Sequence, residues 1–220
     1  MFLFDQGITM ATPILEEEPV QTDEVLVLSP DMAGTLMTPA EFDAAEVDDD
    51  DGSRYELIQG MLIVTPIPLE AEADPNEELG RLLRNYQESH PQGHALDKTL
   101  FERHVFGGRN RRRPDRVIWA GLGRLPKPRR DPPAIIVEFV SQGRRNRERD
   151  YVEKRREYKA LGVQEYWVID RFHRTMTVYG AKISPKGKKV VPENGVYATP
   201  ILPGFALPLA RLFAVADQWK

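Results

Sequence analysis

The spacing of hydrophobic residues changes along this chain, and each spacing predicts one kind of element. Over residues 77–88 the leucines and a tyrosine recur at helical intervals, which predicts an amphipathic helix that ends at the sequence H-P-Q-G. Residues 134–140 form a continuous apolar run interrupted only by Glu138, the pattern of a central strand covered on both faces. Residues 175–179 alternate, and we interpret them as the outer arm of a hairpin.

Short local signals set the elements of the N-terminal half. The sequence T-P-A-E at residues 38–41 combines a threonine N-cap, a proline at the first helical position and a glutamate three residues after the cap. It predicts a helix that buries Phe42 and Val47 and ends in the acidic run 48–51. Residues 54–65 predict a hairpin, because two apolar runs flank Q-G, a suitable two-residue turn.

The remaining pattern completes one domain. We expect strands over residues 95–106, 115–120 and 165–169, a mobile basic loop at G-G-R-N-R-R-R, a solvent loop at K-I-S-P-K-G-K-K, a helix over 146–161 ended by Gly162, and a C-terminal helix packed by Leu209, Leu212 and Phe213. Residues 1–35 are acidic and have no sustained period, so they predict a flexible tail. The order of elements predicts an α/β (α+β) domain over residues 36–220, a mixed sheet flanked by helices.

Composition narrows the class of protein. The chain has 220 residues, of which 41% are hydrophobic, enough for one domain with its own core. It has no cysteine, which excludes disulfides, thiolate zinc sites and cysteine nucleophiles. No apolar run approaches the roughly 20 residues that span a bilayer, and M-F-L-F-D-Q-G-I-T-M lacks the basic start of a secretory signal. We therefore expect a cytoplasmic protein with no membrane partner.

Charge is distributed unevenly although the net charge is only −4. Residues 1–60 hold fifteen acidic side chains and one basic side chain, whereas residues 98–160 hold nineteen basic and eight acidic ones. A basic middle segment suits a polyanionic substrate. Solvated faces with local ion pairs are the alternative explanation.

The basic segment also contains the candidate chemistry. Asp115 precedes one apolar strand, Glu138 lies inside the next, and Lys154 follows on a helix. Isolated acids seldom enter buried strands, because desolvating a carboxylate costs several kcal/mol, on the order of 5, unless it is paired or binds a metal. Two such acids and a cation suggest a divalent-metal site for phosphate-ester chemistry. Structural roles are the alternative: Asp115 as a cap paired with a neighbouring arginine, Glu138 as a buried structural acid, and Lys154 in surface ion pairs.

Several stretches together resemble a known family. They are M-T-P-A-E-F, R-Y-E-L-I-Q-G, R-R-P-D-R-V, P-P-A-I-I-V-E-F-V-S, D-Y-V-E-K-R-R-E-Y-K-A-L-G-V-Q-E-Y-W-V-I-D and L-P-G-F-A-L-P-L, spread over residues 36–214. This set resembles the PD-(D/E)XK nuclease superfamily, and more closely its Uma-type restriction endonuclease family. The resemblance implies a restriction-endonuclease-like fold and metal-dependent hydrolysis of phosphodiester bonds.

The resemblance also assigns roles within the site. Asp115 and Glu138 would be the ligands of Mg²⁺ or Mn²⁺, and the backbone carbonyl of Phe139 would complete the shell. Glu56 matches the acid of the family's Y-E-L-I motif and would support metal binding. A strand-edge position facing solvent is the other explanation for Glu56.

The catalytic lysine departs from the superfamily pattern. The expected position, two residues after the second acid, is Val140, so Lys154 on the following helix is the substitute, as in the family resembled. Lys154 would stabilise hydroxide and the charge that develops on the phosphate. Tyr158 lies one turn further and would support the site by packing or a hydrogen bond.

Nucleic acid, with DNA favoured, is the partner that the basic segment and the resemblance predict. The candidate phosphate contacts are Arg109, Arg111, Arg112, Arg113, Lys127, Arg129, Arg130, Arg144 and Arg145. A homodimer would suit cleavage of two antiparallel strands. The alternatives are an inactive module on the same fold that binds nucleic acid or a protein partner, and a hydrolase of small phosphate esters, which would need an enclosed pocket.

Overall fold

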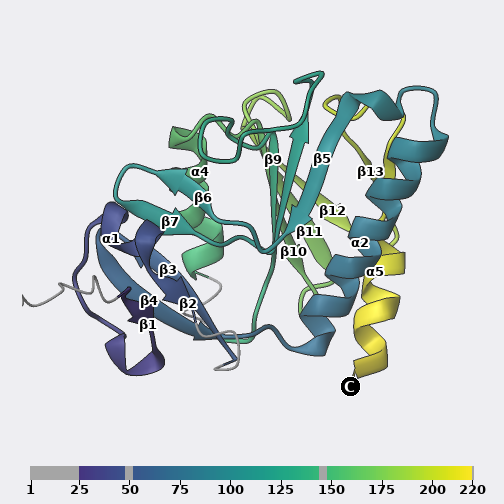
Figure 1. The fold of residues 1–220 in the computed structure, drawn as a ribbon. Coiled ribbons are helices and arrows are strands. Elements are labelled where there is room, and N and C mark those ends of the chain that lie inside the picture. Colours follow the sequence, from purple (N-terminus) through teal and green to yellow (C-terminus); the bar gives the residue numbers. More distant parts are fainter. Residues whose placement is uncertain (1–24, 48–51, 144–147, 220) are drawn as a thin grey trace, which may run out of the picture.

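A six-stranded mixed sheet is the centre of the computed structural model, which describes residues 25–47, 52–143 and 148–219 (Figure 1). Its order is β12-β11-β10-β9-β8-β5, and only β9 and β10 pair in parallel. The strands are β5 (Leu96–Phe101), β8 (Arg116–Ala120), β9 (Ile135–Phe139), β10 (Glu165–Asp170), β11 (Thr175–Tyr179) and β12 (Lys188–Pro192). Every residue of β9 is buried, as its unbroken apolar run predicts.

Helices cover both faces of this sheet (Figure 1). On one face, α2 (Glu70–Ser89) and α5 (Leu209–Ala216) pack leucines against the inward side chains of β9 and β10. On the other face, η4 (Arg149–Glu153), a π-helical turn, leads into α4 (Lys154–Ala160). The buried ring of Tyr158 in α4 packs among Val117, Ile136 and Val168. The sheet therefore separates two apolar cores.

A smaller sheet with the order β4-β3-β7-β6 stands beside α4 (Figure 1). Its strands are β3 (Ser53–Ile58), β4 (Met61–Pro66), β6 (Val105–Gly107) and β7 (Asn110–Arg112). The helix α1 (Pro39–Ala44) covers it through Phe42, which packs with Tyr55, Leu57 and Leu62. These residues form a third apolar core. Three short elements lie next to it: β1 (Val27–Leu28), η1 (Pro30–Met32) and β2 (Glu46–Val47).

Three of the expected local signals are confirmed by the structure. Thr38 and Glu41 form the reciprocal hydrogen bonds of a capping box at the start of α1. The β3–β4 hairpin turns at Gln59 and Gly60, both with positive φ, as a two-residue turn of type I′ requires. Gly162 follows α4 with a φ of 83°, as expected of the residue that ends this helix.

The remaining C-terminal elements are the antiparallel pair β13 (Val196–Ala198) and β14 (Ala206–Pro208), and the short helix η5 (Asp217–Trp219).

Helix boundaries differ from the expectation because packing extends or stops them. α2 starts seven residues early, at Glu70 rather than residue 77, and contains Pro75. Proline removes one backbone hydrogen bond, but Ala71 and Pro75 are buried and continue the helix's inward face. α1 is shorter than predicted: it ends at Ala44, and Val47 is exposed in β2 instead of facing a core.

The predicted strands differ from the observed ones where a strand depends on pairing with a segment that the local pattern does not identify. The strand expected over 95–106 is two strands, because Glu102 has a positive φ between β5 and β6. The expected mobile basic loop is the β6–β7 hairpin. β11 is an interior strand, because part of the expected solvent loop forms β12 and pairs with it.

Residues 1–24 of the expected tail lie outside the described residues, whereas residues 25–35 are described. For residues 25–35 the prediction was wrong: β1 pairs with β2, and Leu28 is buried in the third core. In the described part of the chain, no helix is both long enough and apolar enough to cross a membrane.

The packing of α2 on the larger sheet predicts an asymmetry between two identical substitutions. Leu83 is fully buried in α2, whereas Leu125 is a mostly exposed loop residue. Leu83→Ala should lower the free energy of unfolding by about 2–5 kcal/mol, because it removes apolar contacts and leaves a cavity. Leu125→Ala should change it by less than about 0.5 kcal/mol. Urea unfolding of both variants measures the difference, and equal losses would contradict this packing.

Candidate active site

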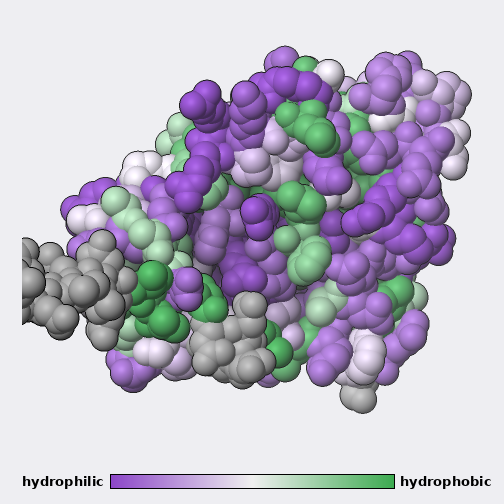
Figure 2. Space-filling view, in the orientation of Figure 1, coloured by the Kyte–Doolittle hydropathy of each residue, from purple (hydrophilic) through white to green (hydrophobic). Residues whose placement is uncertain are grey.

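A pocket of about 320 Å³ lies at the C-terminal end of β9, between the smaller and the larger sheet. Hydrophilic residues gather in the hollow between the two sheets (Figure 2). The pocket is lined by both signs of charge, from Arg54, Glu56, Glu72, Arg113, Asp115, Glu138, Arg149, Asp150 and Lys154, together with Phe139. The structure thus brings all the predicted catalytic and metal-binding residues to one place.

Asp115 is held between the two sheets, immediately before β8. One carboxylate oxygen, Oδ2, accepts the Phe139 N–H at 2.7 Å, and Oδ1 lies 3.6 Å from Nη1 of Arg54. Asn76 in α2 donates to the backbone carbonyl of Asp115 at 2.8 Å. Burial raises the pKa of the Asp115 carboxyl above its usual value, although Lys154 and the Phe139 N–H lower it. Asp115 is therefore a positioned, strongly desolvated acid.

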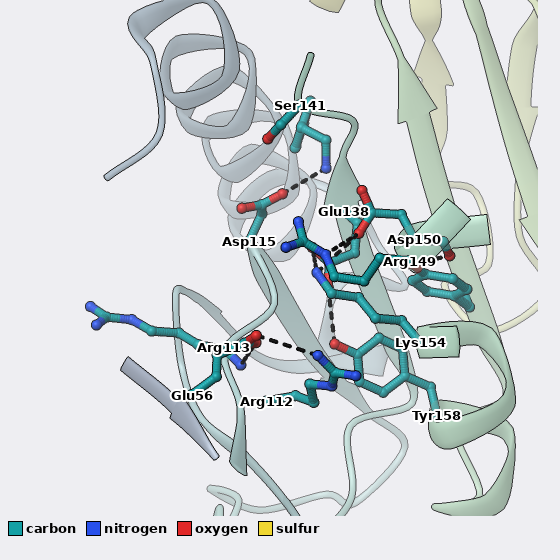
Figure 3. A network of polar contacts seen from close by, with 12 residues as sticks. Glu56, Arg112, Arg113, Asp115, Glu138, Ser141, Arg149, Asp150, Lys154 and Tyr158 are labelled. Carbon is teal, nitrogen blue, oxygen red and sulfur yellow. Dashed lines mark hydrogen bonds and ion pairs between the residues drawn. The ribbon is translucent and has the colours of Figure 1, made fainter. Parts of the chain in front are cut away.

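Glu138 points out of β9 into the same pocket (Figure 3). Tyr158 Oη donates to Glu138 Oε1 at 2.9 Å, and the Lys154 ammonium lies 2.8 Å from Oε2. Burial raises the pKa of Glu138 to about 8 against the opposing effect of Lys154, while the Asp115 charge raises it further. Tyr158 thus makes the hydrogen bond that was one of its two expected supporting roles.

Lys154 is buried at the start of α4 and lies between two carboxylates (Figure 3). Its Nζ is 2.8 Å from Glu138 Oε2 and 3.1 Å from Asp150 Oδ1. Burial alone lowers the pKa of Lys154, but Asp150, Glu138 and Glu56 more than offset this and raise it above the ordinary value. Lys154 is therefore a permanent cation that points at the acids, and not a lysine in surface ion pairs.

Asp150 is the main site residue that the sequence analysis missed. It is buried in η4, four residues before Lys154, and Tyr166 Oη donates to its backbone carbonyl at 2.9 Å. The i,i+4 spacing in D-Y-V-E-K was the available signal, because it places an acid and a lysine on one helix face. The pocket-lining residues Arg54, Glu72 and Arg149 were also missed, and their sequence neighbourhoods contain no comparable signal.

The Glu56 carboxylate binds the residues that immediately precede Asp115 in the chain. Its Oε1 accepts the Arg113 backbone N–H at 2.7 Å, and its Oε2 lies 3.4 Å from Nη1 of Arg112. Burial raises the pKa of Glu56, but Lys154, Arg112 and the Arg113 N–H outweigh it, so the pKa is lowered overall. Glu56 is therefore a buried anion that fixes the backbone before Asp115, and not a solvent-facing acid.

The predicted phosphate contacts fall into different environments. Arg112 is buried and forms hydrogen bonds with Glu157 at 2.6 and 2.8 Å, so its expected contact with a phosphate is wrong. Arg111 and Arg129 both pair with Asp43, with N–O distances of 2.8 Å, and both lie over the ring of Phe106. These three arginines join α1, α4 and the smaller sheet.

The other predicted phosphate contacts are more accessible. Arg109, Lys127 and Arg130 are exposed, and Arg113 lines the pocket. Arg144 and Arg145 lie outside the described residues. Of the histidines, His104 has a structural position: its ring contacts the Tyr55 carbonyl at 2.9 Å, and burial lowers its pKa.

The donor set fits a divalent cation bound by few protein ligands. Among residues 25–47, 52–143 and 148–219, no group of three or more His, Cys, Asp or Glu side chains is placed to hold a metal. Mg²⁺ is commonly held by one or two carboxylates, with water and substrate phosphate as the other ligands. Burial raises the pKa of Asp115, Glu138 and Glu72, and a cation beside them would favour their ionised forms.

Comparisons with known proteins agree with this architecture. Residues 39–210 match the model of the Uma2 family, described as "Putative restriction endonuclease". A crystal structure from Anabaena variabilis ATCC 29413, described as "a putative nuclease belonging to DUF820", has a TM-score of 0.61 and 17% sequence identity, and covers 82% of this chain and 99% of its own. At that identity the likeness shows the fold, a mixed α/β domain, and confirms the expected fold class. No curated protein matches the sequence.

The buried pairing of Lys154 predicts a large loss of stability when its charge is removed. Lys154→Met would leave Glu138 and Asp150 buried without their cation, so the free energy of unfolding should fall by about 3–5 kcal/mol. Lys159→Met, on the exposed side of the same helix, should change it by less than about 0.5 kcal/mol. Urea unfolding at neutral pH compares them. Equal stability of the two variants would show that Lys154 is not buried between the acids.

Proposed function

This chain belongs to the Uma2 family, and on that premise we propose that it is a divalent-metal-dependent nuclease that hydrolyses phosphodiester bonds, with DNA as the favoured substrate. The observation that carries the proposal is the placement of Lys154. A lysine on a separate helix extends into the pocket of Asp115 and Glu138 and lies 2.8 Å from the Glu138 carboxylate. An ammonium held in a pocket with desolvated acids is the arrangement that stabilisation of developing negative charge requires.

The carboxylates of Asp115 and Glu138 would hold the metal ion. A bound divalent ion supplies positive charge that polarises the scissile phosphate and acidifies water near it. The Phe139 N–H keeps one Asp115 oxygen oriented, and Tyr158 does the same for Glu138. Binding would require both carboxylates to be ionised, which the Lys154 charge favours.

Lys154 would act as a fixed charge and not as a base. Its raised pKa keeps it protonated, so it cannot accept a proton from water near neutral pH. An ammonium has three N–H donors, and two of them reach Glu138 and Asp150. The third would stabilise hydroxide or a phosphate oxygen as charge develops there. Asp150 would position Lys154, and Glu56 would position the segment before Asp115.

Phosphate groups would be held at the pocket by cations that line it. Arg54, Arg113 and Arg149 contribute side chains there, and each also has a carboxylate partner, Glu102 for Arg54 and Arg113 and Asp150 for Arg149. Arg149 lies 3.5 Å from Asp150 and is largely desolvated, yet its pKa is raised by the surrounding acids. Guanidinium groups recognise phosphate oxygens by paired hydrogen bonds. These arginines, and not the buried Arg112, are the proposed phosphate contacts nearest the reaction.

Activity should depend on the metal and on both carboxylates. With Mg²⁺ or Mn²⁺ we expect cleavage of plasmid or single-stranded DNA that EDTA abolishes. Asp115→Asn and Glu138→Gln should each slow it by about a hundredfold or more, because they remove charged ligands while keeping side-chain shape. Asp31→Asn, at an exposed position, is the matched control and should cleave like the parent chain. RNA of the same sequence tests the choice of DNA.

Two results would contradict the nuclease proposal. One is equal cleavage by Asp115→Asn and Asp31→Asn. The other is a folded parent chain that binds no divalent ion at millimolar concentration and cleaves no nucleic acid. The second result, combined with retained nucleic-acid binding, would favour the inactive binding module.

A further inference from the structure

A second and larger pocket lies at the opposite end of the sheet from the candidate active site. It has a volume of about 620 Å³ and is formed by one side of α4, the segment between α4 and β10, the start of β10, the end of β11 and the loop that follows β11. The active-site pocket opens at the end of β9, which runs parallel to β10. We name the second site the Arg155 pocket, after the arginine of α4 that lines it.

The Arg155 pocket is strongly basic. Its lining includes Arg155 and Lys159 from α4, and Lys182 and Lys186 from the loop after β11. Glu165 is the one carboxylate in this lining among the described residues. It is buried, and it already accepts hydrogen bonds from three neutral donors, Trp167 Nε1, Tyr197 Oη and Thr199 Oγ1, at 2.8–2.9 Å. The field in the pocket is therefore positive.

These cations differ from the predicted phosphate contacts of the β6–β7 region. Arg111 and Arg129 share Asp43, and Arg112 binds Glu157, so each of these arginines already has a carboxylate partner within the protein. Within residues 25–47, 52–143 and 148–219, no carboxylate pairs with Arg155, Lys159, Lys182 or Lys186. All four are exposed. Four unneutralised cations around one concave surface favour an anionic ligand.

The pocket also offers a flat surface for stacking. The guanidinium of Arg155 lies over the ring of Tyr179, 4.3 Å from its centroid, and that ring stacks on Tyr166 at 6.2 Å. Tyr179 is buried whereas Arg155 is exposed, so we take the guanidinium of Arg155 as the plane on which a ligand would stack. Nucleic-acid bases stack on arginine planes of this kind. An aromatic base could therefore rest on Arg155 while a phosphate contacts the lysines.

We propose that the Arg155 pocket binds a nucleotide, with the base stacked on Arg155 and the phosphate held by Lys159, Lys182 and Lys186. The volume lies within the range of roughly 300–1,000 Å³ that is usual for small-ligand sites. The chemistry is the same for a free mononucleotide and for one nucleotide of a strand. This proposal does not depend on nuclease activity, because none of the four residues lines the active-site pocket.

The test is direct titration of the full chain in EDTA, which prevents metal-dependent cleavage. Deoxyadenosine 5′-monophosphate, a single-stranded (dA)₆ and inorganic phosphate are titrated separately by calorimetry. Lys182→Glu combined with Lys186→Glu should weaken binding of both nucleotide probes by about tenfold or more, because attraction becomes repulsion. Arg155→Gln should remove most of the preference for the mononucleotide over phosphate, about tenfold.

A charge-matched control separates this site from general electrostatic attraction. Arg84→Glu combined with Lys98→Glu makes the same change in net charge at exposed positions on α2 and β5. It should leave both affinities within about twofold, because neither residue lines the pocket. Tighter binding of (dA)₆ than of the mononucleotide by more than tenfold would identify a strand as the ligand, and similar affinities would identify the free nucleotide.

The proposal is overturned if neither nucleotide probe binds at millimolar concentration. It is also overturned if the control pair weakens binding as much as the Lys182 and Lys186 pair does. Since these titrations use no metal and measure no cleavage, a negative result leaves the nuclease proposal untouched. Inactivity of the parent chain likewise leaves this one untouched.

Discussion

The burial of charge around Lys154 constrains much of this structure. Glu138, Asp150 and Lys154 are all nearly inaccessible to water, and removing ions from water costs several kcal/mol each, on the order of 5, unless partners compensate. The three groups compensate one another over 2.8–3.1 Å. Because the partners come from β9, η4 and α4, the strand and the helical segment must be docked correctly before the charges are satisfied.

Other ion pairs around the site likewise depend on the correct docking of separate elements. Glu56 and Glu157 surround Arg112, so β3, β7 and α4 meet through one buried guanidinium. Asp43 then joins α1 to Arg111 of β7. The larger sheet has an apolar core on each face and the smaller sheet has a third, but ion pairs connect the smaller sheet to α4. The pocket of Asp115 lies at this junction, which explains why its residues come from elements far apart in the sequence.

Many basic residues of the middle segment form ion pairs within the folded protein and do not remain as free surface charge. Arg112 is buried beside Glu157, and Arg111, Arg124 and Arg129 pair with aspartates. The cations at the candidate active-site pocket are paired with acids as well, whereas within the described residues Arg155, Lys159, Lys182 and Lys186 have no carboxylate partner. A count of basic residues therefore predicts attraction for a polyanion, but it does not identify the surface where that anion binds.

The sequence by itself determined the elements with strong local signals and singled out the acids and the lysine that the fold brings together. The capping box at Thr38, the Q-G turn and the apolar run of β9 each depend on neighbouring residues alone, so they could be read directly. The acid in that run, Glu138, was conspicuous because apolar strands rarely contain one. The pattern of residues offered Lys154 as the accompanying cation, and the family resemblance gave it the role of the lysine expected at Val140.

Tertiary structure decided the element boundaries and strand positions that depend on contacts between segments far apart in the sequence. The β6–β7 hairpin, the start of α2 before Pro75 and the interior position of β11 all follow from partners that no local window contains. The same is true of the chemistry: Asp150 became a site residue, and Arg112 became a structural one, only when η4 and α4 docked on the sheets. Burial and ion pairing are properties of the assembled chain, and they set the role of each charged residue.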